Sequence, residues 1–145
     1  MVSAATNAAE LAANTYVVAG ATPQQEALVR AQIQIMQPAM FPLRIIFVPH
    51  WKYIDTARIF RLHVPTGYTS AIFTHLPSRT VFVDKDYESD CRLGDSLAHE
   101  LGHMATNSTK EEDAERVARE YRNRLKGAHE GSILRPSRCI GLSLN

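Results

Sequence analysis

The 145-residue sequence has no apolar run long enough to span a bilayer, and it carries almost no net charge. The formal charge of +1 gives no electrostatic reason to expect nucleic acid or a membrane surface as a partner, so we expect neither. The basic segment and continuous apolar core of a signal peptide are missing from residues 1–20, which favours a cytoplasmic location. Apolar residues (45%) and charged residues (21%) occur in globular proportions, and we expect one domain over residues 1–145.

Cysteine is also scarce, and the two cysteines, Cys91 and Cys139, do not form a metal-binding motif. One interpretation is a pair of unrelated reduced thiols. The other is a disulfide that ties the C-terminal segment to the region before residue 96, which would require an oxidising compartment. The sequence favours neither interpretation.

The distribution of β-branched and aromatic residues indicates the fold class. Four such runs are expected to form strands: residues 43–48, 59–64, 69–76 and 79–84. The last two flank the turn signal Pro77-Ser78 and predict a hairpin. An alanine-rich segment, residues 3–18, and the segment from Thr22 to Pro38 are expected to be helical. Because no helix is expected between strands, the pattern predicts an α+β fold with a small mixed or antiparallel sheet of three to four strands.

The stretch from Ser96 to Met104 contains the pattern H-E-x-x-H, formed by His99, Glu100 and His103. On a helix, positions i and i+4 lie on one face, so both imidazoles can bind one metal ion. Glu100 is placed to hold and deprotonate a metal-bound water, and zinc suits these ligands. The apolar residues of this helix fall on the opposite side: Leu93, Leu97, Leu101 and Met104. The alternative is a pair of solvent-exposed histidines beside an incidental glutamate.

A third protein ligand is expected from the next helix, which a capping box at Ser108 or Thr109 opens and which runs through Leu125. Four acids stand near its start: Glu111, Glu112, Asp113 and Glu115. Helical phase places Glu111 closest to the apolar stripe and makes it the best ligand, with Glu115 second. Glu115 could instead orient an imidazole, and all four acids could simply stabilise the helix dipole.

These two helical motifs, SLAHELGH at residues 96–103 and EEDAERVA at residues 111–118, resemble those of zincin metallopeptidases of the gluzincin type, in particular the ImmA/IrrE-like proteins and minimal gluzincins. The resemblance implies a zincin-like sheet packed on an active-site helix and a following ligand helix. It also implies Glu111 as the zinc glutamate and an edge strand that pairs with extended substrate.

The expected function is that of a zinc-dependent endopeptidase acting on a peptide or protein substrate. His99, His103 and Glu111 would hold Zn²⁺, and Glu100 would act as the catalytic base. The alternatives are a catalytically silent zincin-fold module that binds or regulates a partner, and a metal-free domain with an accidental motif.

Several other residues are candidates for supporting roles. His75 could assist an oxyanion, whereas His50, His63 and His129 are expected to be packed or surface residues. Three tyrosines are possible transition-state donors: Tyr68, Tyr87 and Tyr121. A further hypothesis places the tail, residues 131–144, in the cleft with the Cys139 thiolate as a removable zinc ligand.

Overall fold

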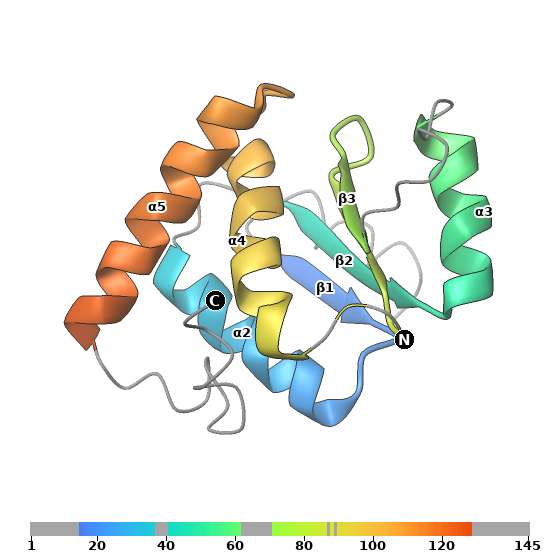
Figure 1. The fold of residues 1–145 in the computed structure, drawn as a ribbon, viewed down its shortest axis with the longest axis horizontal. Helices are drawn as coiled ribbons and strands as arrows, with labels where there is room; N and C mark the ends of the chain where they lie inside the picture. Colours follow the sequence, from blue (N-terminus) through green and yellow to red (C-terminus); the bar gives the residue numbers. More distant parts are fainter. Residues whose placement is uncertain (1–14, 37–40, 62–70, 87, 89, 129–145) are drawn as a thin grey trace, which may run out of the picture.

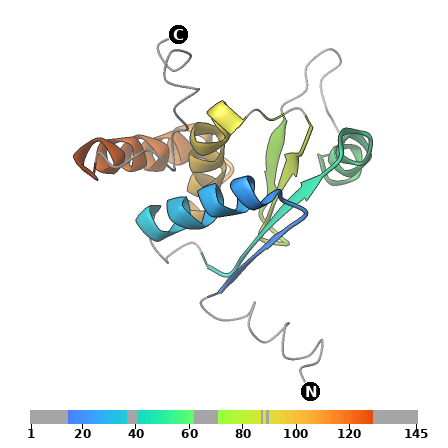
Figure 2. The same cartoon turned by 90° about the horizontal axis from the view of Figure 1, so that it is seen from below.

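A mixed four-stranded sheet forms the centre of the molecule, with helices on both of its faces (Figure 1, Figure 2). The computed structural model describes residues 15–36, 41–61, 71–86, 88 and 90–128. Its elements are β1 (Tyr16–Ala19), α2 (Pro23–Met36), β2 (Leu43–Val48), α3 (His50–Arg61), β3 (Ile72–His75), β4 (Thr80–Asp84), α4 (Asp90–Thr106) and α5 (Glu111–Ala128). The predicted α+β class is confirmed.

The strand order in the sheet is β1-β2-β4-β3. β3 and β4 form the predicted antiparallel hairpin, with Thr74 opposite Val81. β1 and β4 both run parallel to β2, and the connections between these parallel strands pass through α2 and α3. The expectation of no helix between strands is therefore wrong.

Two predicted segments are corrected by the structure. Residues 16–19 form β1 rather than the end of a helix, while residues 1–14 lie outside the described part. Residues 59–61 end α3 rather than begin a strand, and residues 62–64 are not described. In α3, Tyr53 and Ala57 are buried one helical turn apart against the sheet, so packing at helical spacing prevails over the β-propensity of the segment around Ile59.

Side-chain alternation along the strands produces two apolar layers. Ile45 and Phe47 of β2 pack in the layer that contains α2, α4 and α5. Ile46 and Val48 point to the opposite face, where they pack with Tyr53 of α3. Figure 2 shows the same division, with α2, α4 and α5 on one side of the sheet and α3 on the other.

Helix α2 begins as the sequence predicts. The Thr22 hydroxyl accepts a hydrogen bond from the Gln25 amide at 3.1 Å, and the Gln25 side-chain oxygen accepts one from the Thr22 amide at 2.9 Å. This reciprocal pair satisfies two backbone donors at the helix start. Across the described residues, no helix combines the length and the apolar character needed to cross a membrane.

Candidate metal centre

Helix α4 presents its two histidines on the side away from its apolar stripe. Leu93, Leu97 and Leu101 are at most 1% exposed and face the core, as the helical phase predicts. The His99 side chain is 26% exposed and that of His103 is 9% exposed. The pair therefore lies at the boundary between the core and a surface pocket, where imidazoles are accessible to an ion and still held by packing.

The turn between α4 and α5 reverses the chain within a few residues. The Asn107 amide donates to the Met104 carbonyl and the Ser108 amide donates to the His103 carbonyl, each at 3.2 Å, which is the hydrogen-bonding pattern of a Schellman motif. Asn107 has a φ of 51°, and asparagine tolerates this left-handed conformation better than most residues. The tight reversal lets α5 begin only eight residues after His103, directly beside α4.

The predicted capping box is replaced by a different arrangement at the start of α5. The Ser108 hydroxyl accepts from the Lys110 amide at 3.0 Å and donates to the Asp113 carboxylate at 2.7 Å. This removes Asp113 from the set of candidate ligands, because its carboxylate is bonded within the turn and also pairs with Arg116.

Close packing of α4 and α5 depends on Gly102. A Cβ atom at this position would lie 2.5 Å from the Ala114 carbonyl oxygen and 2.9 Å from the Ala114 Cα. The helices therefore touch backbone to backbone at this point. Ala114 itself is fully buried, and one helical turn before it Glu111 is brought over the two histidines.

Replacing Gly102 by alanine is expected to destabilise the protein by about 1–3 kcal/mol, the usual cost of overpacking against atoms that cannot move aside. It should also weaken the zinc binding predicted from the sequence, because α5 must shift away from α4 and carry Glu111 with it. Thermal unfolding and zinc titration of the variant test this. Ala105→Gly is the matched control, since Ala105 is exposed on the same helix. If Gly102→Ala unfolds at the wild-type temperature and binds zinc as wild type does, the close contact between Gly102 and Ala114 determines neither the stability nor the position of Glu111.

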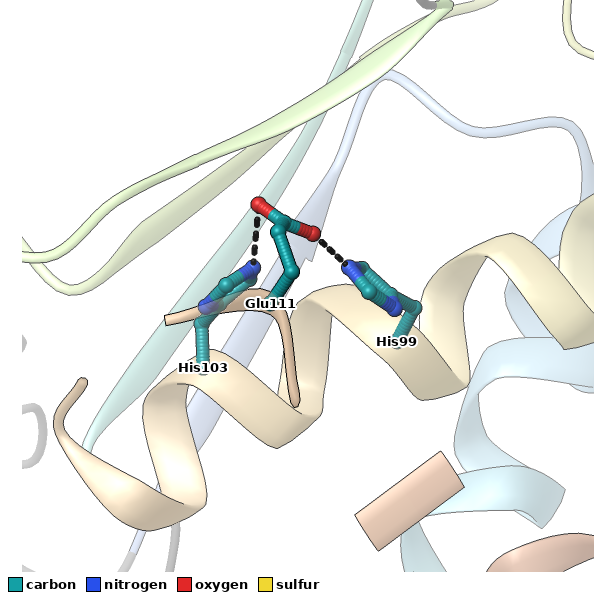
Figure 3. A group of neighbouring side chains, drawn as sticks. All are labelled: His99, His103 and Glu111. Atoms are coloured by element: carbon teal, nitrogen blue, oxygen red, sulfur yellow. Dashed lines mark hydrogen bonds and ion pairs between the residues drawn. The ribbon is translucent and has the colours of Figure 1, made fainter. Parts of the chain in front are cut away.

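The three predicted metal ligands converge (Figure 3). His99 Nε2 lies 2.6 Å from Glu111 Oε1, and His103 Nε2 lies 3.6 Å from Glu111 Oε2. One ligand atom from each residue lies within 4.8 Å of the others, and no other such group of histidine, cysteine or acidic ligands occurs among the described residues. In a tetrahedral site with zinc bonds of about 2.0–2.1 Å, ligand atoms lie about 3.3 Å apart, so this cluster can close around one ion with small adjustments.

Hydrogen bonds orient both imidazoles for metal binding. His103 Nδ1 lies 2.8 Å from the Ser108 carbonyl oxygen, which can only accept, so Nδ1 donates to it and Nε2 is the nitrogen turned toward Glu111. His99 Nδ1 lies 3.2 Å from Glu115 Oε1 and donates to this carboxylate. Each ring thus presents Nε2 to the common point, as partners behind metal-binding histidines generally ensure.

The charge environment of His99 favours a cation at this place. Burial opposes protonation of His99, but hydrogen bonds to Glu111 and Glu115 outweigh it and raise the pKa of the imidazole. The same carboxylates that stabilise a proton on Nε2 would stabilise a metal ion there. Metal and proton therefore compete for one position.

The cluster lies on the wall of a pocket of about 590 Å³ between β3, α4 and the start of α5. Glu100 also lines this pocket, and the Thr74 hydroxyl donates to Glu100 Oε1 at 2.6 Å. Burial raises the pKa of the Glu100 carboxyl, while the hydrogen bond from Thr74 and the nearby histidines act in the opposite direction. A carboxyl group whose pKa is raised by burial binds a proton more readily than an exposed glutamate does, which suits a group that transfers protons.

The remaining acids at the start of α5 are placed differently from Glu111. Glu112 is exposed and takes no part in the cluster. Glu115 contacts the outer nitrogen of His99, which matches the orienting role that the sequence left open for it. Glu111 is thus the acid of this segment that reaches both histidines.

Two other predicted candidates that the structure describes, His75 and Tyr121, do not line the pocket. His75 follows Thr74 on β3, and because side chains alternate, it points to the opposite face, where Nδ1 lies 2.7 Å from the Ser78 hydroxyl. Tyr121, on the inner side of α5, is 2% exposed and packs in the core. The other candidates, Tyr68, Tyr87, His63, His129 and the tail with Cys139, lie outside the described residues.

His50, which was expected to be a packed or surface residue, is partly exposed and held by hydrogen bonds. Its Nδ1 lies 2.6 Å from the carboxylate of Asp84, which is 1% exposed, and its backbone amide donates to Asp86 at 2.8 Å. These contacts join the start of α3 to the end of β4.

Cys91, on the first turn of α4, is disulfide-bonded. This agrees with the disulfide interpretation rather than with two unrelated thiols. Cys139 lies outside the described residues.

Two residues that donate hydrogen bonds to the carboxylates of the site were not predicted from the sequence. Thr74 was placed in a strand without a role, and Arg122, which donates to Glu115, was not singled out. Strand alternation could have indicated Thr74, since it shares a face with the buried Ile72. Helical phase could have indicated Arg122, but only after the position of Glu115 was known.

Glu88 is a carboxylate behind the pocket wall with one buried oxygen, Oε2, that has no hydrogen-bond partner. Burial raises the pKa of its carboxyl above the ordinary value, although a hydrogen bond from Ser96 and the charge of Arg92 act against this. Because the folded-state pKa is raised, stability falls as pH rises from the unfolded-state pKa through the folded-state pKa. Ionisation of Glu88 in the folded state is therefore destabilising.

Glu88→Gln is expected to stabilise the fold at pH 7 by about 1 kcal/mol, because it keeps the shape of the side chain and removes the buried charge, and an unsatisfied buried group costs more when charged than when neutral. The gain should disappear below about pH 4, where Glu88 is protonated in both the folded and unfolded states. Thermal unfolding of both proteins across pH 3–8 measures this. Glu112→Gln, at an exposed position, should change little at any pH. An equal gain at both ends of the pH range would show that the charge of Glu88 is not the cause.

Comparisons of the chain with protein-family models, with curated proteins and with solved structures found no match. Its function is therefore inferred from the residues and geometry of the site.

Proposed function

We propose that this protein is a zinc-dependent endopeptidase with a zincin-like arrangement of its sheet and its two site helices. The observation that carries the proposal is the convergence of His99, His103 and Glu111 on the wall of the pocket that also contains Glu100. Two imidazole nitrogens and one carboxylate oxygen are a ligand set that zinc favours in hydrolytic sites.

His99, His103 and Glu111 would hold the ion. When bound, zinc would lower the pKa of a water molecule and polarise the carbonyl group of the substrate. Glu100 would accept a proton from the attacking water and deliver it to the amine that leaves. The short hydrogen bond from Thr74 fixes the direction of the Glu100 carboxylate, so its second oxygen is left for the reaction.

The substrate is proposed to be an extended polypeptide that lies along β3. This strand stands at one end of the sheet order, and Ile72, Thr74 and Leu76 line the pocket. The Asp84 amide donates to the Ala71 carbonyl, so these two residues form a hydrogen-bonded pair of the antiparallel ladder. Hydrogen-bonded and non-hydrogen-bonded pairs alternate along such a ladder, which makes Thr74 and its partner on β4 a non-hydrogen-bonded pair. The backbone groups of Thr74 therefore face away from β4, toward the side on which a substrate strand would pair.

The experiment that tests this function is incubation of zinc-loaded protein with an unfolded protein substrate, followed by mass spectrometry of the products. We expect new peptide termini that require zinc and are absent with the Glu100→Gln variant. Zinc binding together with substrate binding, but with no cleavage by the wild type, would instead support the binding or regulatory module. A wild-type protein that takes up no zinc would refute both.

A further inference from the structure

We propose that Arg122 is a positioning residue of the metal centre, which acts by holding Glu115 against His99. The inference rests on the metal site of the proposed function, but not on its peptidase activity.

The two carboxylate oxygens of Glu115 have separate partners. Oε1 accepts from His99 Nδ1 at 3.2 Å, and Oε2 accepts a hydrogen bond from Arg122 Nη2. The Glu115 side chain is 43% exposed, so packing alone does not fix its rotamer. Without Arg122, this carboxylate would be free to turn into solvent and leave the His99 Nδ1 proton without its acceptor.

The three residues Glu111, Glu115 and Arg122 occupy one face of α5. At 3.6 residues per turn, Glu115 lies about 40° and Arg122 about 20° around the helix from Glu111. One helix thus supplies the metal ligand, the acceptor behind the histidine and the cation that fixes this acceptor. Because the helix is rigid, it holds these three side chains in fixed positions relative to one another, as precise metal sites require.

An ordinary surface ion pair would have a different signature. Arg122 is 35% exposed, and exposed ion pairs contribute little to folding stability. We therefore expect loss of Arg122 to leave the unfolding temperature nearly unchanged and to act on zinc affinity. The direction of the change in zinc affinity distinguishes a charge effect from a positioning effect, since a positive charge near a zinc ion repels it. Removing Arg122 would strengthen zinc binding if charge alone mattered, and will weaken it if Arg122 positions Glu115.

The test is zinc affinity, measured by competition with a chromophoric chelator, for wild type, Arg122→Met, Glu115→Gln and the double variant. Arg119→Met is the matched control, because it removes the same charge from an exposed position of the same helix. We expect Arg122→Met to bind zinc about tenfold more weakly, at the low end for partners of metal-binding histidines, and Arg119→Met to match wild type. In the Glu115→Gln background, Arg122→Met should have no further effect.

Nuclear magnetic resonance of the zinc-loaded protein gives a second readout. The His99 Nδ1 proton should give an exchange-protected signal in wild type, lose it in Arg122→Met and regain it in part in Arg122→Lys. The inference is overturned if Arg122→Met binds zinc as tightly as Arg119→Met or more tightly, or if its effect persists in the Glu115→Gln background. It is also overturned if the wild type binds no zinc. A protein that binds zinc but cleaves nothing refutes the peptidase function alone.

Discussion

Glu100→Gln is expected to lower kcat/KM for peptide cleavage by about 10²–10⁴-fold, the range for loss of a positioned general acid–base group. Glutamine retains the size of the side chain and can still accept the Thr74 hydrogen bond, but it cannot accept a proton from water. Glu100 is not one of the three converging ligands, so zinc content should remain at about one ion per chain. Steady-state cleavage of a defined peptide and elemental analysis of the same preparation measure both quantities.

The matched control is Glu120→Gln, at an exposed position of α5. It should retain wild-type cleavage and wild-type zinc content. Full cleavage by Glu100→Gln would show that another group transfers the proton. Loss of zinc together with activity would show that Glu100 contributes to metal binding, and its proposed role would then need to be revised.

Glu111→Ala is expected to weaken zinc binding on the order of 10²–10³-fold. Structural zinc sites with four ligands bind with about 10–16 kcal/mol, or roughly 2.5–4 kcal/mol for each ligand. His103→Ala should produce a comparable loss. The affinity is measured by chelator competition at fixed pH, since protons compete for His99.

Glu112→Ala is the control for Glu111→Ala, because it removes a neighbouring acid that is exposed and stands apart from the cluster. It should bind zinc as wild type does. If His103→Ala loses zinc but Glu111→Ala retains it, the third ligand is a different carboxylate, and Glu115 would be the next to test. Comparison of zinc binding by these variants therefore distinguishes a wrongly assigned third ligand from a protein that has no metal site.

Local sequence was sufficient for features that lie within one element. The four-residue spacing of His99 and His103 and the opposing leucine stripe follow from helical periodicity, and both are present in α4. The hairpin around Pro77-Ser78 follows from strand propensity and a turn signal. Convergence of Glu111 with both histidines depends on two helices and a turn, and phase on α5 already selected it over its neighbours.

The same local rules failed where pairing partners are distant. The short segment Tyr16–Ala19 becomes a strand because it pairs with β2, some 27 residues away along the chain. The segment around Ile59 looks like a strand in isolation, but it belongs to α3 because Tyr53 and Ala57 pack on the sheet. Propensity is a weak preference that burial against a distant surface overrides.

The sequence by itself determined the chemical type of the centre: two imidazoles one helical turn apart, a base beside them and a short list of acids. Only the tertiary structure decided that Asp113 bonds the turn at Ser108, and that Thr74 and Arg122 donate hydrogen bonds to Glu100 and Glu115. The physical reason is that ligand type and spacing are properties of one helix. Which side chains meet across helices depends on backbone approach, such as the contact of Gly102 with Ala114, and this approach is set by packing of the whole fold.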